Sequence, residues 1–319
     1  MVAEICTKTF TLNTGAKIPA VGLGTWQGQP GTNDSATLQQ SIIYALDLGY
    51  RHIDTAAAYD VEVDVGKAIK QSNVKREDLF VTTKLWSTHH DKVEETFLKS
   101  LESLGLDYID LYLMHWPMSL AADGKTPLEH PTPTETWLSM EAVIKKYPSK
   151  LKAIGVSNFS PALLDDLLAQ ASIVPAANQI ELHPMLPQES LMSYCKSKGI
   201  LVTAYSPLGQ QKAPMLTHPV ISGLADKYGV SVAQIILSWE VAYGVSTIPK
   251  SSNEGRLKQN LTLIPELDAA DFKAISDLHK IKGMHRRLCQ VNGHSPKYGE
   301  KVLGWTMEQL GWEPWDDPE

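Results

Sequence analysis

The sequence predicts an α/β fold, a (β/α)8 TIM barrel with an N-terminal β-hairpin cap and a long C-terminal loop. Short apolar segments and amphipathic segments alternate eight times along the chain, as parallel strands joined by crossover helices require. The apolar segments carry few polar residues on either face, which is typical of strands covered on both sides. Eight strands favour a closed barrel over an open sheet, and no Gly-x-Gly-x-x-Gly motif follows the first strand.

The length of 319 residues suits one large barrel, which needs about 250 residues, or two average domains. No linker or shift in composition divides the chain, so we expect a single domain over residues 1–319. The expected strands cover residues 21–25, 52–55, 79–85, 109–114, 151–156, 177–182, 200–205 and 245–248. The expected helices cover residues 35–48, 61–71, 92–104, 134–147, 161–169, 188–198, 220–228, 231–243, 253–261 and 268–280.

The two ends of the chain differ in character. Residues 7–12 and 17–19 flank an Asn-Thr-Gly turn and predict a hairpin, too short for the core, that covers one end of it. Residues from Ile281 onward show no strong period and carry Trp305, Trp312 and Trp315, so an irregular loop is expected there.

Composition narrows the range of partners. The net charge of −7 argues against nucleic acid and anionic membranes, although a phosphorylated ligand needs only a local cluster of cations. The three cysteines, Cys6, Cys195 and Cys289, form no Cys-x-x-Cys motif, which predicts free thiols in a reducing compartment. The sequence shows no secretory signal and no apolar stretch of roughly 20 residues, so we expect a cytoplasmic protein.

Polar side chains collect at the predicted strand ends, which form one rim of a barrel. Asp54 and Lys84 end otherwise apolar strands on neighbouring positions of the sheet, where unpaired charges would be costly, so we expect them to pair. Tyr59 follows Asp54 in its loop, and His115 ends the fourth strand. The other rim residues are Thr25, Trp26, Trp86, Trp116, Ser157, Asn158, Gln179, His183, Tyr205, Ser206, Pro249, Lys250 and Ser251.

These residue types indicate acid catalysis by a tyrosine. A lysine beside a phenol favours the phenolate and lowers the pKa of the tyrosine, while Asp54 holds the ammonium of Lys84 in position. His115 can donate a hydrogen bond to a carbonyl oxygen or help to relay a proton. No Gly-x-Ser-x-Gly motif is present, and His89-His90 has no further ligand at metal spacing, so no metal site is expected.

A proton donor without a nucleophile or metal completes only half of a reaction. Hydride transfer from a cofactor would supply the other half. Residues 248–253, followed by Arg256, combine hydroxyls, a helix N-terminus and two cations, which suit a phosphate group. A capped, solvated helix start remains the alternative for this segment.

The motifs together resemble the aldo-keto reductase superfamily over nearly the whole chain. They are GLGTW (22–26), GYRHIDTAAAY (49–59), TTKLW (82–86), DLYLMHWP (110–117), GVSNF (155–159), AYSPLG (204–209) and IPKSSNEGRLKQN (248–260). The resemblance implies a catalytic tetrad of Asp54, Tyr59, Lys84 and His115 with Tyr59 as the acid, and aromatic walls of the substrate pocket at Trp26, Trp86 and Trp116.

The resemblance also implies NADP(H) in an extended pose. Its nicotinamide would stack on Tyr205, its amide would contact Ser157, Asn158 and Gln179, and its 2′-phosphate would lie on Lys250, Ser251, Asn253 and Arg256. Gln259 and Asn260 would lie near the adenine. Further contacts are expected from Thr25, Trp26, Asp54, Ser206, Leu208, Gly209, Gln210, Ile248, Pro249 and Ser252.

Some positions depart from the family pattern. Val61 replaces the usual asparagine two residues after the tyrosine, which we expect to affect packing more than catalysis, and Gln27 stands where many relatives have lysine. The tail, which sets substrate choice in this family, is more similar to fungal glycerol dehydrogenase and glyceraldehyde reductase relatives than to the animal enzymes.

We therefore expect a monomeric NADPH-dependent enzyme that reduces aldehydes or ketones, with small aldehydes such as glyceraldehyde or sugar aldehydes as substrates. One alternative is a non-catalytic NADP-binding barrel, comparable to channel-associated subunits or lens proteins. Another is a different barrel enzyme, such as a phosphate-sugar isomerase, which would need no nicotinamide.

Overall fold

Eight parallel strands form the central sheet of the computed structural model, which describes residues 2–27, 34–209, 213–289 and 296–315. In sheet order, which is also chain order, the strands are β4 (Leu23–Gly24), β5 (His52–Asp54), β6 (Phe80–Leu85), β7 (Leu111–Met114), β8 (Ile154–Ser157), β9 (Ala177–Glu181), β10 (Leu201–Tyr205) and β11 (Ser246–Thr247). The predicted boundaries are correct to within three residues.

The sheet closes into a barrel between its first and last strands. Val21, just before β4, forms a parallel bridge with Thr247 of β11. The amide of Gly22 donates to the carbonyl of Thr247 at 2.8 Å, and the amide of Thr247 donates to the carbonyl of Ala20 at 2.8 Å. These hydrogen bonds leave no open edge, and the predicted (β/α)8 barrel is confirmed.

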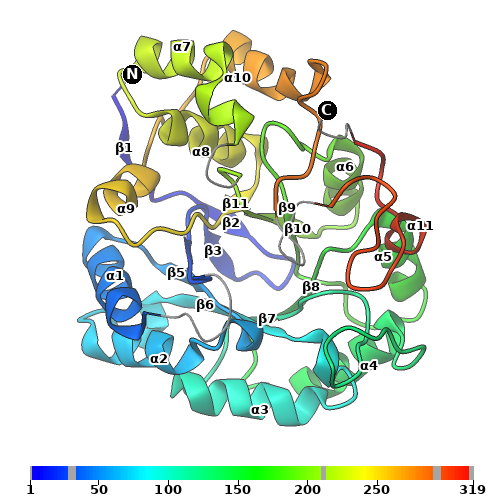
Figure 1. The fold of residues 1–319 in the computed structure, drawn as a ribbon. Helices are drawn as coiled ribbons and strands as arrows, with labels where there is room; N and C mark the ends of the chain where they lie inside the picture. The colour runs from blue at the N-terminus through cyan, green and yellow to red at the C-terminus, as the bar shows by residue number, and fades with distance from the viewer. Residues whose placement is uncertain (1, 28–33, 210–212, 290–295, 316–319) are drawn as a thin grey trace.

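Helices surround the sheet, as Figure 1 shows. They are α1 (Ser35–Leu48), α2 (Glu62–Gln71), α3 (Val93–Leu104), α4 (Pro133–Lys146), α5 (Pro161–Leu168), α6 (Glu189–Ser197), α7 (Pro219–Tyr228), α8 (Val232–Tyr243), α9 (Glu254–Leu261) and α10 (Ala269–Ser276). The predicted helix over 268–280 is wrong at its end, because α10 stops at Ser276 and a 3-10 turn, Leu278–Lys280, follows. The ring of His279 bonds the Ser276 carbonyl at 2.7 Å, where a continuing helix would place an amide.

The predicted hairpin covers the N-terminal end of the barrel. Its strands are β2 (Thr9–Thr11) and β3 (Lys17–Pro19), which pair antiparallel. Leu12 and Ile18 pack with side chains from the starts of the barrel strands, among them Phe80, Leu111 and Ala177. The expected cap is therefore confirmed, and the opposite rim is left for the site.

Two short strands and one helical turn escaped sequence prediction. β1 (Glu4–Ile5) pairs antiparallel with β12 (Thr262–Leu263), and both strands are too short to show a period. The tail contains one helical turn, α11 (Met307–Leu310), which Thr306 and Gln309 cap reciprocally, so the expectation of an irregular loop is wrong there. In Figure 1 the tail lies beside α5.

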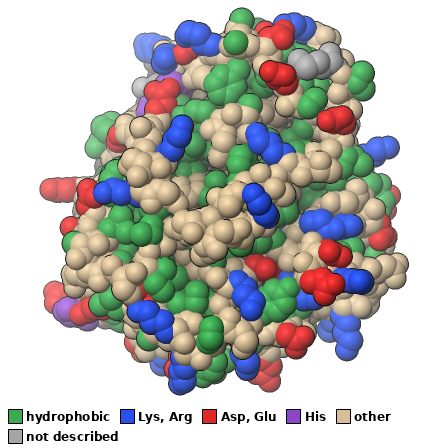
Figure 2. All heavy atoms as spheres, turned by 180° about the vertical axis from the view of Figure 1, so that it is seen from behind, with side chains coloured by type: hydrophobic (Ala, Val, Ile, Leu, Met, Phe, Trp, Pro, Cys, Tyr) green, Lys and Arg blue, Asp and Glu red, His purple; other side chains and the backbone are tan. Residues whose placement is uncertain are grey.

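The surface charges and the cysteines are those of an ordinary globular protein. On the face shown in Figure 2, acidic and basic side chains are interspersed. The three cysteines are free thiols, as predicted. Among the described residues no single helix is long and apolar enough to cross a membrane, and α7 with α8 satisfies the length and composition test only as a pair bent by 93°.

The contact between α2 and α3 depends on a helical glycine, which gives a stability prediction. A Cβ on Gly66 would lie 2.1 Å from the carbonyl oxygen of Leu104, a backbone atom that cannot move aside. We expect Gly66→Ala to lower the free energy of unfolding by about 1–3 kcal/mol in urea denaturation. The matched control is Gly223→Ala in α7, where a Cβ meets nothing within 4 Å, so it should stabilise the protein by about 0.5–1 kcal/mol. Equal effects of the two substitutions would contradict this account.

Candidate active site

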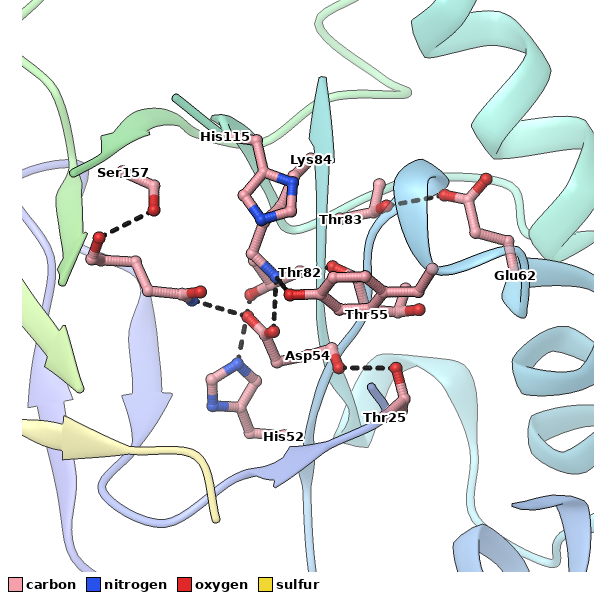
Figure 3. A network of polar contacts seen from close by, with 12 residues as sticks. Thr25, His52, Asp54, Thr55, Glu62, Thr82, Thr83, Lys84, His115 and Ser157 are labelled. Atoms are coloured by element: carbon pink, nitrogen blue, oxygen red, sulfur yellow. Dashed lines mark hydrogen bonds and ion pairs between the residues drawn. The ribbon is translucent and has the colours of Figure 1, made fainter. Parts of the chain in front are cut away.

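A buried ion pair lies at the centre of the C-terminal rim. Nζ of Lys84, on β6, lies 2.5 Å from Oδ1 of Asp54, the last residue of β5, and the two side chains are 0% and 2% exposed. The same ammonium donates to the carbonyl of Thr55 at 2.8 Å. The structure thus contains the pair expected from two charges in apolar strands, and Figure 3 shows both side chains directed toward each other.

The second oxygen of Asp54 is also occupied. Gln179, on β9, donates its side-chain amide to Oδ2 of Asp54 at 2.7 Å across the barrel mouth. Thr25 donates its hydroxyl to the backbone carbonyl of Asp54 at 3.0 Å. With both carboxylate oxygens and its carbonyl bonded, Asp54 has one orientation, and Lys84 is directed by it.

Tyr59 reaches this ion pair from the loop after β5. It ends a 3-10 turn, Ala57–Tyr59, which Asp60 closes in the left-handed region at φ 56°. The Tyr59 hydroxyl lies 3.4 Å from Nζ of Lys84, and the ammonium lies 4.9 Å from the centroid of the phenol ring. The five-residue spacing between Asp54 and Tyr59 therefore spans the strand end and one tight turn.

The pKa of Tyr59 differs from the sequence expectation. Burial raises the pKa of Tyr59 above its ordinary value, and the charge of Lys84 opposes this effect without overcoming it. The expected net lowering of the pKa is wrong, because sequence alone cannot measure desolvation. The phenol stays protonated at neutral pH, which is the state that an acid must have.

Lys84 itself remains charged. Burial lowers the pKa of Lys84, but the Asp54 carboxylate and the Tyr59 hydroxyl outweigh it, and the net direction is upward. The ammonium therefore presents a fixed positive charge to the phenol oxygen.

His115, at the end of β7, lies against the same tyrosine. Its ring centroid is 5.6 Å from that of Tyr59 and 5.2 Å from that of Trp86. Burial, and then the charge of Lys84, lower the pKa of His115 well below its ordinary value. The imidazole is neutral at physiological pH, so hydrogen-bond donation to a carbonyl oxygen suits it better than relay through a cationic ring.

A second hydrogen-bonded chain extends along the rim from β8 to β10. Ser157 donates to the carbonyl of Gln179 at 2.8 Å, and the Asn158 side-chain amide donates to Oγ of Ser157 at 3.1 Å. The hydroxyl of Tyr205 donates to Oδ1 of Asn158 at 2.7 Å. These four side chains, which the resemblance assigns to the nicotinamide, are thus brought together and joined to Asp54 through Gln179.

Backbone strain gathers at the same rim. Five non-glycine residues of the described chain have positive φ, and Asp60, Asn158 and Ser206 are three of them. The Gly209 amide donates to the Ser206 carbonyl at 2.8 Å, and a Cβ on Gly209 would lie 2.7 Å from Leu288 of the tail. Leu208 packs partly buried on the core, and Gln210 lies outside the described residues.

Two cations lie close to each other where β11 leads into α9, Lys250 in the loop and Arg256 in the helix. Oγ of Ser251 accepts from the amide of Asn253 at 3.1 Å and from Nε of Arg256 at 3.4 Å. Partial burial and the charge of Arg256 lower the pKa of Lys250. In the part of the chain that the structure describes, neither cation has an ion-pair partner. Two mutually repelling cations beside a capped helix start fit a phosphate group.

The remaining residues predicted to contact the cofactor differ in burial and in hydrogen bonding. The backbone amide of Ile248 donates to the Ala204 carbonyl at 3.1 Å. The carbonyl of Pro249 accepts from the Gly24 amide at 3.2 Å. Ser252 and Gln259 are exposed, and Asn260 is buried. No hydrogen bond of the described chain joins the side chains of Gln259 or Asn260 to the Lys250–Arg256 cluster.

Two of the three predicted pocket tryptophans, Trp86 and Trp116, belong to one aromatic and apolar cluster. Trp116 is buried with tail residues that include Met307, Leu310 and Trp315, and Trp86 packs against the same cluster. Trp26 is 47% exposed and makes no ring contact in the described chain. Trp86 and Trp116 therefore lie together on one side of the rim beside His115, and a pocket role for Trp26 stays a prediction.

Sequence reasoning missed Glu181 and Arg287, which join the rim to the tail. Glu181 ends β9 and pairs with Arg287 at 3.4 Å. A carboxylate at the end of a predicted buried strand was a signal that could have identified Glu181, but nothing marked its partner in the tail. No group of three or more possible metal ligands occurs among the described residues.

The two departures from the family pattern lie at the starts of helices, Val61 before α2 and Gln27 in the segment before α1. Val61 is buried in the main core and is the N-cap of α2. Its expected effect on packing more than on catalysis stays a prediction. Gln27 directs its amide to the carbonyl of Asp34 at 3.5 Å.

Comparison with known proteins decides the family. The model of the aldo/keto reductase family matches residues 20–280, which is more than half of the chain. The chain belongs to the aldo/keto reductase family. The resemblance stated from the motifs is therefore confirmed.

The relatives come from several organisms. A Saccharomyces cerevisiae protein named glycerol 2-dehydrogenase (NADP(+)) is 47% identical over 88% of this chain and 93% of its own. A Hypocrea jecorina D-galacturonate reductase is 41% identical, with coverage of 84% and 89%. Among solved structures, a Bombyx mori aldo-keto reductase in complex with NADP has a TM-score of 0.81 at 39% identity, and covers 89% of this chain and 95% of that one.

The ion pair makes a prediction that needs no assay of activity. Asp54→Asn leaves the buried ammonium of Lys84 without a counter-charge, so we expect a loss of about 3–5 kcal/mol in the free energy of unfolding. The double variant Asp54→Asn/Lys84→Met removes both charges and should recover most of that loss. Urea denaturation at pH 7 checks both, and additive losses in the double variant would contradict the pairing.

Proposed function

We propose that this protein is an NADPH-dependent reductase that converts aldehydes and ketones to alcohols, with Tyr59 as the general acid. The observation that carries the proposal is the buried Asp54–Lys84 pair, with its ammonium 3.4 Å from the Tyr59 hydroxyl and a neutral His115 alongside. NADPH, when bound, supplies the hydride that the carbonyl carbon receives. A single domain, a monomer and a cytoplasmic location stay predictions.

The residues that would hold the cofactor fall into two groups. Tyr205, Ser157, Asn158 and Gln179 offer a ring, hydroxyls and amides beside Asp54, and these groups suit a nicotinamide with its carboxamide. Lys250 and Arg256, with Ser251 and Asn253, offer cations and donors for the 2′-phosphate. A solved aldo-keto reductase complexed with NADPH, 34% identical with a TM-score of 0.84, supports the choice of cofactor.

The chemistry of the chain's own residues follows from their charge states. The protonated Tyr59 donates its proton to the carbonyl oxygen as charge develops there. The ammonium of Lys84 stabilises the phenolate that remains, and Asp54 keeps that ammonium in place. Neutral His115 donates a hydrogen bond to the same oxygen and so orients the carbonyl.

Small aldehydes such as glyceraldehyde or sugar aldehydes are the proposed substrates. Relatives named as acting on glycerol and on D-galacturonate, both small and hydroxylated, support this choice. The complete network of Asp54, Lys84, Tyr59 and His115 argues against a non-catalytic barrel, which would need none of it.

The role of Tyr59 is tested by removing one oxygen. Tyr59→Phe removes the proton donor and keeps the ring, so kcat for glyceraldehyde should fall by about 10²–10⁴-fold. The dissociation constant of NADPH, measured by fluorescence titration, should change by less than about twofold, because the phosphate and nicotinamide contacts remain. Near-normal turnover in this variant would exclude Tyr59 as the acid.

The preference for NADPH is tested at the two cations. Each charge-assisted hydrogen bond to a phosphate contributes about 1.5–3 kcal/mol, so Lys250→Ala or Arg256→Ala should weaken NADPH binding about 10–100-fold. Binding of NADH, which lacks the 2′-phosphate, should change by less than about threefold in either variant. Lys258→Ala, an exposed lysine on the same helix, is the matched control and should leave both affinities unchanged. Equal losses for NADPH and NADH would contradict the assignment.

A further inference from the structure

Arg287 is a buried cation of the tail that contacts both the barrel and the tail aromatic residues. It is 5% exposed, and its Nη1 lies 3.4 Å from Oε2 of Glu181 at the end of β9. Its guanidinium carbon lies 3.5 Å from the ring centroid of Trp312 and 5.2 Å from that of Trp315. A planar guanidinium suits both a carboxylate and an aromatic face, which an ammonium does not.

Glu181 holds more of the tail than this one side chain. Its Oε1 accepts from the backbone amides of Leu288 at 2.5 Å and Cys289 at 2.7 Å. Side chains two residues apart on a strand point to the same side, so Glu181 shares the face of Gln179, which bonds Asp54. One strand thus orients the catalytic carboxylate and anchors residues 287–289.

Both members of the pair carry charge where water is largely excluded. Burial raises the pKa of Glu181, but the hydrogen bond and charge of His183 and the charge of Arg287 outweigh it and hold the pKa below its ordinary value. Burial lowers the pKa of Arg287, and Glu181 opposes that shift. Removing Glu181 therefore leaves the buried charge of Arg287 without its counter-charge.

Trp312, on which Arg287 stacks, also packs near the proposed active site. The ring centroid of Trp312 lies 6.0 Å from that of Trp116, which follows His115 in the chain. Trp116 is buried with Met307, Leu310 and Trp315 of the tail. The tail segment 302–315 therefore contacts the wall beside the proposed acid, and Arg287 connects that segment to β9.

We propose that Glu181 and Arg287 are positioning residues that hold Trp312 and the tail segment 302–315 as the outer wall of the substrate pocket. The pair sets the affinity for bulky aromatic carbonyl substrates and leaves the chemical step unchanged. This inference rests on the proposed reductase function. A small aldehyde contacts Tyr59 and His115 without reaching the outer wall, whereas an aromatic aldehyde extends to it.

The test compares one small and one bulky substrate under saturating NADPH. In Arg287→Ala, KM for 4-nitrobenzaldehyde should rise about tenfold, because the wall loses its stacking partner. KM for glyceraldehyde, and kcat for both substrates, should stay within about threefold of the parent. A general loss of structure would instead lower kcat for both substrates together.

Three further variants identify the cause. Arg287→Lys keeps the charge and loses the planar stack, so its KM for 4-nitrobenzaldehyde should follow that of Arg287→Ala. Trp312→Leu leaves the ion pair intact and should reproduce the rise, and the double variant Arg287→Ala/Trp312→Leu should be no worse than either single variant. The control is Arg286→Ala, the adjacent arginine, whose backbone amide bonds Met185 at 3.2 Å and whose side chain makes no ring contact in the described chain.

A second readout is independent of activity. Native-state proteolysis should cut within residues 296–315 several-fold faster in Arg287→Ala than in Arg286→Ala. If the parent protein reduces neither aldehyde with NADPH, the proposed function fails. In that case the proteolysis of Arg287→Ala against Arg286→Ala alone decides whether Arg287 positions the tail. If the parent is active, equal KM changes for the two aldehydes, additive effects in the double variant, or equal proteolysis of the two arginine variants would each overturn the inference.

Discussion

The contact on which the site depends is the 2.5 Å ion pair between Asp54 and Lys84. Both groups lie at the ends of adjacent parallel strands, so the register of β5 and β6 brings them together. Neither charge could remain there alone, because an unpaired ion in a largely dry barrel costs several kcal/mol, of order 3–5 when one partner is removed. The pair in turn fixes the ammonium near the Tyr59 hydroxyl and places a permanent positive charge beside His115.

The charge states of the neighbouring groups follow from this pair and from burial. Desolvation keeps Tyr59 protonated and His115 neutral, while the carboxylate keeps Lys84 charged. The arrangement thus has one group that can release a proton, one fixed cation to stabilise what remains, and one neutral donor. On the outer side, Glu181 and Arg287 repeat the same principle, since a buried ion pair there links the barrel to the tail.

The barrel and the central network could be predicted from the sequence because both leave local signals. Eight alternations of apolar and amphipathic segments indicate the fold, and charges at the ends of apolar strands mark Asp54 and Lys84. The pKa direction of Tyr59 could not be predicted, because it depends on how much water the folded chain excludes. The bond from Gln179 to Asp54 crosses 125 positions, and Arg287 lies 106 positions from Glu181 in a tail without a period. Contacts of that kind appear only once the chain is folded.

The central claim is that the Asp54–Lys84 pair governs the proton of Tyr59, and the pH dependence of kcat/KM for glyceraldehyde tests it most directly. In the parent protein activity should hold through neutral pH and fall in the alkaline range as the phenol loses its proton. The charge of Lys84 lowers the pKa of Tyr59 and that of Asp54 raises it by less. In Asp54→Asn/Lys84→Met the remaining activity should be lower and its alkaline fall should move to higher pH. An alkaline fall at the same pH in both proteins would contradict the account.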